Sequence, residues 1–482
     1  MTNIRYLLKG REAAERFEVL KHSGYLLLAR LFARLASLPF QLYAAARLGV
    51  PLFGVFAFTL ASVEMLSALG DMGLSRFGAR ELVRHEDRRA PLAGMILVMQ
   101  ILASALLTVV VLAVLVAVPP GPTKRDVLLL GLAAAFVSSF IFTTDTIFTA
   151  YQRFSASAVF AVAGRVVYLA AGFAALKAGY SVVAVTGAFL LGYLIESALR
   201  MAYSGSRLTS FSFGFSRREL TQVVRGTAPF ALSAIATLVY FRVDTLIMEW
   251  LRGDIAVGIY NAAYSFFAFF VWAPIILART LLPGLTRRFA SDPADGEAAT
   301  WFWYRAVGLA GVPLAFTVTM IAGPLIRTLM PSAFAGSIVT LQILIWSIPM
   351  LMMVTVGFNT LVVTDRERAA AGSTVVTAII ITILDFFLIH YFGVRGAAVA
   401  MVAATAIWLF QVHRLLGRVL APGHGAAGAF GLPVAAGLLM AAAAVLTSGL
   451  GVWVSLAAGL AAYAAATGLG GALRPASTWM RL

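Results

Sequence analysis

Long apolar runs alternate with short polar segments along almost the whole chain. The runs reach about 20 residues or more, the length at which a helix crosses a hydrocarbon core of roughly 30 Å. They lack the alternation of polar and apolar positions that the strands of a membrane barrel show. A backbone inside lipid must also satisfy its polar groups within its own segment. The pattern therefore predicts an all-α integral membrane protein with about fourteen transmembrane helices.

The expected spans share this length and a low density of charge. We place them near residues 24–46, 52–71, 92–118, 127–150, 156–176, 181–203, 227–250, 256–279, 303–324, 337–362, 371–392, 396–416, 428–447 and 451–472. The composition agrees, because 61% of the 482 residues are hydrophobic and only 12% are charged. A soluble domain carries roughly 45–50% apolar and about 25% charged residues.

Basic residues gather in every second loop between the expected spans. Clusters of arginine fall within 76–89, 200–225 and 279–305, whereas the intervening loops hold isolated bases such as Arg47 and Lys177. Because cytoplasmic loops carry an excess of Lys and Arg, this alternation predicts that both termini are cytoplasmic. Membrane orientation then explains most of the net charge of +16. We expect no nucleic-acid partner, since the bases form no binding stripe.

The spans divide the chain into five parts. Residues 1–21 are charged and amphipathic, and we expect them to form an interfacial segment on the cytoplasmic leaflet. Residues 22–204 would form an N-lobe of spans 1–6, and 205–226 a cytoplasmic linker. Residues 227–418 would form a C-lobe of spans 7–12, and 419–482 the last two spans with the C-terminal tail.

Two short sequence echoes relate the two expected lobes. Segments 48–57 and 252–261 keep the same glycine spacing, and in both the second glycine is followed by an aliphatic and an aromatic residue; segments 178–185 and 392–399 are a second pair. Such patterns are also common in apolar sequence, so coincidence is the alternative. A repeat of six spans would place both halves in the same direction, related by an axis along the membrane normal. We therefore expect two six-helix lobes related by a parallel repeat, plus two C-terminal helices.

Several motifs occur in a specific order. The first half contains Arg34, then Ala46-Arg47-Leu48-Gly49, then Leu69-Gly70-Asp71-Met72-Gly73-Leu74-Ser75-Arg76. The second half contains Tyr240-Phe241-Arg242-Val243-Asp244-Thr245, and later Tyr391-Phe392-Gly393-Val394-Arg395-Gly396. In their order and spacing, over nearly the whole chain, these motifs resemble the polysaccharide and oligosaccharide flippases of the multidrug/oligosaccharidyl-lipid/polysaccharide exporter superfamily, which include O-antigen flippases.

This resemblance implies a function and a location. A member of this family would move a polyprenyl-diphosphate-linked oligosaccharide from the cytoplasmic to the periplasmic or outer leaflet, for the biosynthesis of a cell-surface polysaccharide such as lipopolysaccharide. It would do so by alternating access of a cationic central cavity between the two lobes. The location implied is the bacterial inner (cytoplasmic) membrane. Besides the lipid-linked substrate and membrane lipids, the expected partners are a polysaccharide polymerase and a chain-length regulator.

Arginines within the expected spans are the candidates for substrate binding: Arg30, Arg34, Arg165 and Arg242. A charge at a helix centre costs roughly 2.5–3.5 kcal/mol on insertion scales, so it usually faces a cavity or a partner. Arginine recognises phosphate through two parallel hydrogen bonds, which suits a lipid diphosphate. Arg34 also matches a family arginine. The alternatives are snorkelling to the interface and, for Arg242, neutralisation by Asp244 or Glu249.

Carboxylates within the expected spans are the candidates for coupling transport to an ion: Glu64, Asp244 and Asp385. Glu64 lies at middle depth on the second span and could instead pair with Arg34. Asp145 and Glu196 lie toward the inner ends of their spans and are interpreted as interfacial. For each acid, the alternative is a partner role beside an arginine.

Sequence features of enzymes are missing from the chain. There is no Gly-rich nucleotide loop, nucleophile elbow or zinc-spaced histidine pair, and there is no cysteine. We therefore predict a protein that is not an enzyme and has no catalytic residues, metal site or cofactor. Two other functions stay open: a cation-coupled multidrug exporter of the same superfamily, and a membrane enzyme of polysaccharide assembly. The exporter would need a net acidic cavity, and the enzyme usually a sizeable outer loop.

Overall fold

The protein is built from α-helices. The computed structural model describes residues 2–214, 216–420 and 425–469, with side chains from Ala36 onward except at 217, 229, 425–430 and 469. Nine helical stretches among the described residues are long and apolar enough to cross a membrane. The predicted class is therefore confirmed: the chain is an all-α, multi-pass integral membrane protein.

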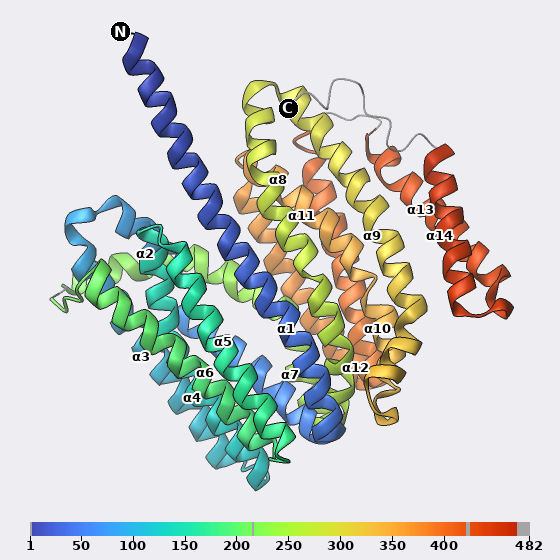
Figure 1. Ribbon diagram of the computed structural model, residues 1–482, viewed down its shortest axis with the longest axis horizontal. Coiled ribbons are helices and arrows are strands. Elements are labelled where there is room, and N and C mark those ends of the chain that lie inside the picture. Colours follow the sequence, from blue (N-terminus) through green and yellow to red (C-terminus); the bar gives the residue numbers. More distant parts are fainter. Residues whose placement is uncertain (1, 215, 421–424, 470–482) are drawn as a thin grey trace. The chain divides into compact units, whose positions relative to one another are not determined.

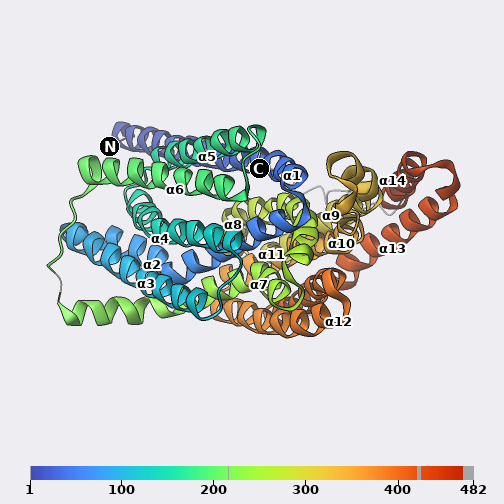
Figure 2. The same cartoon turned by 90° about the horizontal axis from the view of Figure 1, so that it is seen from below.

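The chain divides into two compact units, Met1–Leu246 and Ile247–Leu482. The helices of the first unit are α1 (Thr2–Asp71), α2 (Leu74–Arg84), α3 (Arg89–Ala117), α4 (Pro122–Ala150), α5 (Phe154–Lys177), α6 (Val182–Tyr203) and the first part of α7 (Arg217–Phe270). Within this unit α4 packs against α3 and α6, and α5 packs against α6 and α1 (Figures 1 and 2).

The second unit contains the rest of α7 and seven further α-helices. These are α8 (Trp272–Ser291), α9 (Pro293–Leu329), α10 (Ser337–Leu344), α11 (Ser347–Val363), α12 (Glu367–Leu416), α13 (Gly425–Leu446) and α14 (Val452–Leu469). Within this unit α11 packs against α8, α9 and α12, while α13 packs against α14 and α9 (Figure 1). Apolar burial joins α13 and α14 to α9 around Phe316 and Met440, and the Tyr463 hydroxyl donates to the Leu309 carbonyl at 3.0 Å.

The three longest helices each contain one glycine whose backbone leaves the helical region. Gly49 in α1 has φ 73° and ψ 173°, Gly253 in α7 has φ 74° and ψ −176°, and Gly393 in α12 has φ 58° and ψ −133°. A side chain disfavours these conformations, so glycine is the residue that suits them. Each of these helices therefore consists of two helical parts joined at a kink.

These kinks help to explain why the described residues contain nine membrane-length helical stretches where fourteen spans were expected. The predicted pairs 24–46 with 52–71, 227–250 with 256–279, and 371–392 with 396–416 each meet at one of the three glycines. The chain changes direction there at a single residue, so no separate loop divides the two parts. The eighth predicted span differs further, because α7 ends at Phe270 and α8 begins at Trp272.

The glycine geometry matches the sequence echoes. Gly49 and Gly253, which occupy the same position in the first pair of echoed segments, have nearly the same backbone angles. Gly179 and Gly393, which the second echo aligns, both have positive φ, at 81° and 58°. The echoed segments therefore share a local backbone feature as well as a residue pattern.

Replacing Gly253 by alanine should destabilise the fold by about 1–3 kcal/mol, because a Cβ strains this backbone conformation. A Cβ at this position would meet nothing within 4 Å, so the loss would come from the backbone alone. The measurement is the apparent melting temperature in detergent micelles. Gly187→Ala is the matched control, since this helical glycine also has open space around a Cβ. Equal melting temperatures for Gly253→Ala and wild type would contradict the assignment of strain.

Candidate functional site

An ion pair joins two helices of the first unit. Nε of Arg242, on α7, lies 2.5 Å from Oε2 of Glu64, on α1. The Arg242 side chain is 15% exposed and the Glu64 side chain 43% exposed, so solvent reaches the carboxylate more than the guanidinium. The sequence also offered Arg34, whose side chain lies outside the described residues, for Glu64, and Asp244 or Glu249 for Arg242. The structure shows that Glu64 and Arg242 pair with each other.

The other two acidic candidates are buried. Asp244, two residues after Arg242, is 1% exposed, and its Oδ1 accepts a hydrogen bond from the Thr245 amide at 2.5 Å. In the second unit, Asp385 of α12 is fully buried. A carboxylate removed from water is costly unless its charge is compensated or it takes up a proton. Burial therefore separates Asp244 and Asp385 from the more exposed Glu64.

Arg165 has an aromatic neighbour. It is half-buried on α5, and its guanidinium carbon lies 5.7 Å from the ring centroid of Tyr168, one turn further along the helix. A guanidinium over an aromatic face is attracted by the ring's negative charge density. The remaining substrate candidates, Arg30 and Arg34, lie on α1 before Ala36, so their side chains fall outside the described residues.

A buried arginine that the sequence placed in a loop holds both acids interpreted as interfacial. Arg200, at the end of α6, is 4% exposed. Its Nη1 lies 3.1 Å from Asp145 Oδ1 and its Nε 2.9 Å from Glu196 Oε1, and its Nη2 donates to the Ser157 carbonyl at 3.2 Å. This cluster ties α4, α5 and α6 together. The spacing of Glu196 and Arg200, four residues apart on one helix, was the sequence signal that could have revealed it.

A second arginine also belongs to a helix rather than to a loop. Arg279 was grouped with the cytoplasmic bases, but α8 continues through it to Ser291, and its side chain is exposed. The Asn359 side chain of α11 donates to the backbone carbonyl of Ala278, next to Arg279, at 2.9 Å. The apolar residues on both sides of Arg279 were the sequence signal that could have placed it inside a helix.

The motif after the second expected span forms a polar network. Oδ1 of Asp71 accepts from the amide and hydroxyl of Ser75, at 3.0 and 2.5 Å, and from Nε2 of Gln100 at 2.7 Å. The Gln100 side-chain carbonyl in turn accepts from the Thr143 hydroxyl, and Gln100 is fully buried. The network joins α1, α2, α3 and α4, so it supports the turn at Gly73 and holds the helices in place.

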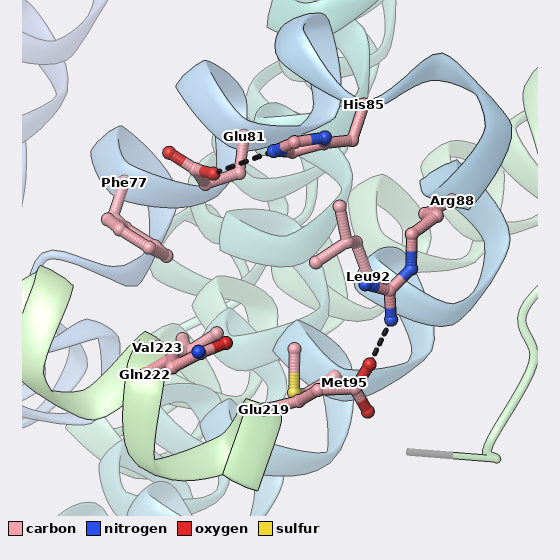
Figure 3. A pocket seen from close by; sticks show the side chains of 9 residues that line it. All are labelled: Phe77, Glu81, His85, Arg88, Leu92, Met95, Glu219, Gln222 and Val223. Carbon is pink, nitrogen blue, oxygen red and sulfur yellow. Dashed lines mark hydrogen bonds and ion pairs between the residues drawn. The ribbon is translucent and has the colours of Figure 1, made fainter. Parts of the chain in front are cut away.

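A pocket of mixed polar and apolar lining lies between α2, α3 and the start of α7 (Figure 3). The side chains that line it are Phe77, Glu81, His85, Arg88, Leu92, Met95, Glu219, Gln222 and Val223. Figure 3 shows Arg88 reaching to Glu219, with which it forms an ion pair. Glu81 and His85 face each other, with 3.5 Å between Oε2 and Nε2.

Glu219 also stabilises the start of α7. It accepts from the Ser216 amide at 2.6 Å and donates through its own amide to the Ser216 hydroxyl at 3.3 Å, which is a capping box. The Ser216 amide hydrogen bond first, and the Arg88 hydrogen bond second, lower the pKa of Glu219 from 4.5 to about 2. This carboxylate therefore fastens the linker before α7 to the turn that precedes α3.

The lowered pKa predicts an acid-dependent stability. Because the folded state favours the charged Glu219, its stabilisation is complete above pH 4.5 and is lost as the pH falls toward about 2. Glu219→Gln should therefore lower the melting temperature at pH 7 and flatten its fall between pH 5 and pH 3. Asp87→Asn, which removes an exposed acid of the neighbouring turn, is the control. Parallel curves for Glu219→Gln and wild type would rule out this role.

The fold of the chain is similar to that of solved membrane transporters. It is similar to the lipid II flippase MurJ in an inward closed conformation, with a TM-score of 0.74 and 13% identity over 92% of this chain and 98% of that one. It is similar to a multidrug resistance MATE family transporter of the MOP superfamily in an inward-facing conformation, with a TM-score of 0.66 and 15% identity over 81% and 94%. A MOP superfamily transporter from Pyrococcus furiosus, described as having a binding pocket of reverse polarity, gives a TM-score of 0.58 and 15% identity over 83% and 94%.

The sequence adds the family. The profile of the polysaccharide biosynthesis protein family matches residues 19–289, which is more than half of the chain, so the protein belongs to this family. A search of curated protein sequences finds no significant match. The resemblance drawn from the sequence motifs is thereby confirmed, and the similar structures at these low identities establish the fold.

Proposed function

We propose that this protein is a flippase that moves a polyprenyl-diphosphate-linked oligosaccharide from the cytoplasmic to the outer leaflet of the bacterial inner membrane. The observation that carries the proposal is that a member of a polysaccharide biosynthesis family has a fold similar to that of a lipid II flippase. The sequence has no nucleotide-binding loop. Transport by alternating access in a cationic cavity is the mechanism that we infer for it.

The Arg242–Glu64 pair suits a substrate that carries a diphosphate. Glu64 keeps the arginine charge compensated while no substrate is bound, which avoids an isolated charge in an apolar segment. A diphosphate offers more anionic oxygens than one carboxylate and can take both hydrogen-bonding edges of the guanidinium. We propose that it replaces Glu64 on Arg242, and that Arg165, Arg34 and Arg30 are the further candidates for contact.

The helix kinks support a topology of fourteen crossings. Suppose that α1, α7 and α12 each cross twice, at their glycine kinks, that α8 continues the second crossing of α7, and that α10 and α11 share one crossing. The first lobe then contributes six crossings and the second lobe another six. The helices α13 and α14 supply the last two. We propose lobes of residues 22–204 and 227–418 around the linker 205–226, related by a parallel repeat, with both termini cytoplasmic. A polymerase and a chain-length regulator remain the expected partners.

The acids offer a way to couple transport to an ion. Asp244 and Asp385 are buried within apolar helices, where binding or release of a proton or cation would change the local charge. Glu64 would become available to an ion when substrate displaces it from Arg242. We propose these three carboxylates as the coupling candidates.

Arg242→Ala should lower the exposure of lipid-linked repeat units on the periplasmic side by about ten- to a hundredfold, because a hydrogen bond to a charged group is worth roughly 1.5–3 kcal/mol. The measurement is complementation of a flippase-null strain, with the variant inserted at the wild-type level and the repeat units assayed for periplasmic exposure. Arg34→Ala should lose exposure in the same assay. Failure of the wild-type protein with several matched glycans would overturn the flippase proposal.

The double variant Arg242→Ala/Glu64→Gln separates a substrate contact from a structural ion pair. If Arg242 only neutralises Glu64, removing both charges together should restore exposure, since no unpaired carboxylate is left. If Arg242 holds the diphosphate, the double variant should stay as low as Arg242→Ala. Glu64→Gln alone retains the arginine and should keep most of the activity if the ion-coupling role lies with Asp244 or Asp385.

Because the fold is similar to that of a multidrug transporter, export of a cationic drug is the second candidate function. A cation-coupled exporter would remove an added cationic dye from cells, and Glu64→Gln would abolish that export. We expect no dye export, because the arginines of the membrane segments favour an anionic substrate.

A further inference from the structure

The short helix α2 follows directly on the first long helix. Met72 and Gly73 turn the chain after Asp71 with φ values of 47° and 75°, and α2 then runs for 11 residues. At about 1.5 Å per residue, α2 is only about 16 Å long, too short to cross a hydrocarbon core. It falls in a loop that the arginine distribution places on the cytoplasmic side.

One face of α2 is fixed to the rest of the first unit. Leu74 and Phe77 pack with Met95 of α3 and Val223 of α7, and Leu82 packs with Ile96 of α3. These contacts hold α2 in one orientation, so its opposite face is presented to the surroundings in a fixed position.

That opposite face is basic. Arg76, Arg80, Val83 and Arg84, which we call the α2 stripe, lie within an arc of about 100° at 3.6 residues per turn. All four are exposed, with exposed fractions of 44% for the Arg80 side chain, 62% for the Arg84 side chain and 54% for Val83. Successive arginines are four residues apart, which places them about 6 Å apart along the helix axis.

The charges of the α2 stripe are poorly compensated. Glu81 is shared, with one carboxylate oxygen 3.3 Å from Arg80 and 3.8 Å from Arg84, and the other 3.5 Å from His85. Arg76 makes no ion pair with the residues whose side chains the structure describes. The single carboxylate of Glu81 therefore compensates a helix face that carries three arginines.

The arginines that follow are compensated one by one. Arg88 forms an ion pair with Glu219, and Arg89 Nη2 lies 2.7 Å from Glu86 Oε1. Within a single loop, two arginines thus have an acidic partner each, and the α2 stripe is left with excess positive charge. The excess is therefore confined to one exposed helix face.

We propose that the α2 stripe binds anionic phospholipid headgroups of the cytoplasmic leaflet. Phosphatidylglycerol-type headgroups carry single charges spread over a surface, which suits arginines spread over about 12 Å better than one compact diphosphate does. Each such arginine near an anionic surface contributes roughly 1 kcal/mol. Val83, between the arginines, would enter the boundary of the acyl chains. The bound lipid would anchor this end of the first unit at the membrane surface.

The test uses purified full-length protein in nanodiscs that contain phosphatidylglycerol and phosphatidylcholine. The number of phosphatidylglycerol molecules retained per protein after detergent extraction is counted by native mass spectrometry. We expect the wild type to retain phosphatidylglycerol in preference to phosphatidylcholine. The variant Arg76→Gln/Arg80→Gln/Arg84→Gln should lose this preference, by about fivefold in affinity for each arginine neutralised.

The matched control is Arg366→Gln/Arg368→Gln/Arg414→Gln, which removes three exposed arginines of the second unit. It should retain the wild-type preference, and an equal loss in both triple variants would overturn the proposal. Arg76→Gln alone, which disturbs no described ion pair, should give a partial loss even if the triple variant folds poorly. If neither α2 variant loses phosphatidylglycerol, the proposal is wrong.

The alternative source of phosphate is the transported substrate. Farnesyl diphosphate added to the same nanodiscs tests it. If it displaces the retained phosphatidylglycerol from wild type one for one, the α2 stripe serves an isoprenyl diphosphate and the phospholipid proposal is overturned. Since lipid retention requires no transport, this outcome is independent of the flippase assay.

Discussion

The structure depends on one constraint, that backbone polar groups inside a bilayer must bond within their own segment. Helices satisfy this constraint. Where a helix changes direction, as few backbone N–H and C=O groups as possible should be left without a hydrogen bond. The glycines Gly49, Gly253 and Gly393 meet this need, because each turns the chain within one residue and helical bonding resumes at once. Two of the three have nearly the same backbone angles and occupy the same position in echoed segments, so one local solution is used twice in one chain.

The same apolar surroundings govern the charges. Arg200 is almost completely buried and is held by two carboxylates and a carbonyl, which gives it a structural role among α4, α5 and α6. Arg242 has a partner, Glu64, that is more exposed than itself. The charge of Arg242 is compensated while no substrate is bound, and an anion from solution can reach its exposed partner and replace it. A site for an anionic substrate needs both properties. The degree to which each charge is compensated therefore distinguishes Arg200, a structural residue, from Arg242, a candidate for substrate binding.

The charges of the polar loops can be described in the same terms. The capping box of Ser216 and Glu219, together with Arg88, fastens the segment before α7 to the first unit. The linker that a sequence shows only as a polar stretch is thus an ordered connection over its described residues. On α2 the arginines exceed the acids, and the excess charge lies on a face that the buried side holds in place. What a loop can bind therefore depends on how many of its basic residues are paired with acidic residues, more than on the number of basic residues.

The sequence by itself determined the all-α membrane class and the family, and it selected the arginines and acids worth testing, because hydropathy, charge and motif order are properties of local sequence. It could not reveal that Glu64 pairs with Arg242, since 178 residues separate them. Nor could it show that Gln100 donates a hydrogen bond to Asp71, or that Arg200 forms ion pairs with both Asp145 and Glu196. Those pairings come from helix packing, which brings together side chains from distant segments and decides by burial which charges must be compensated.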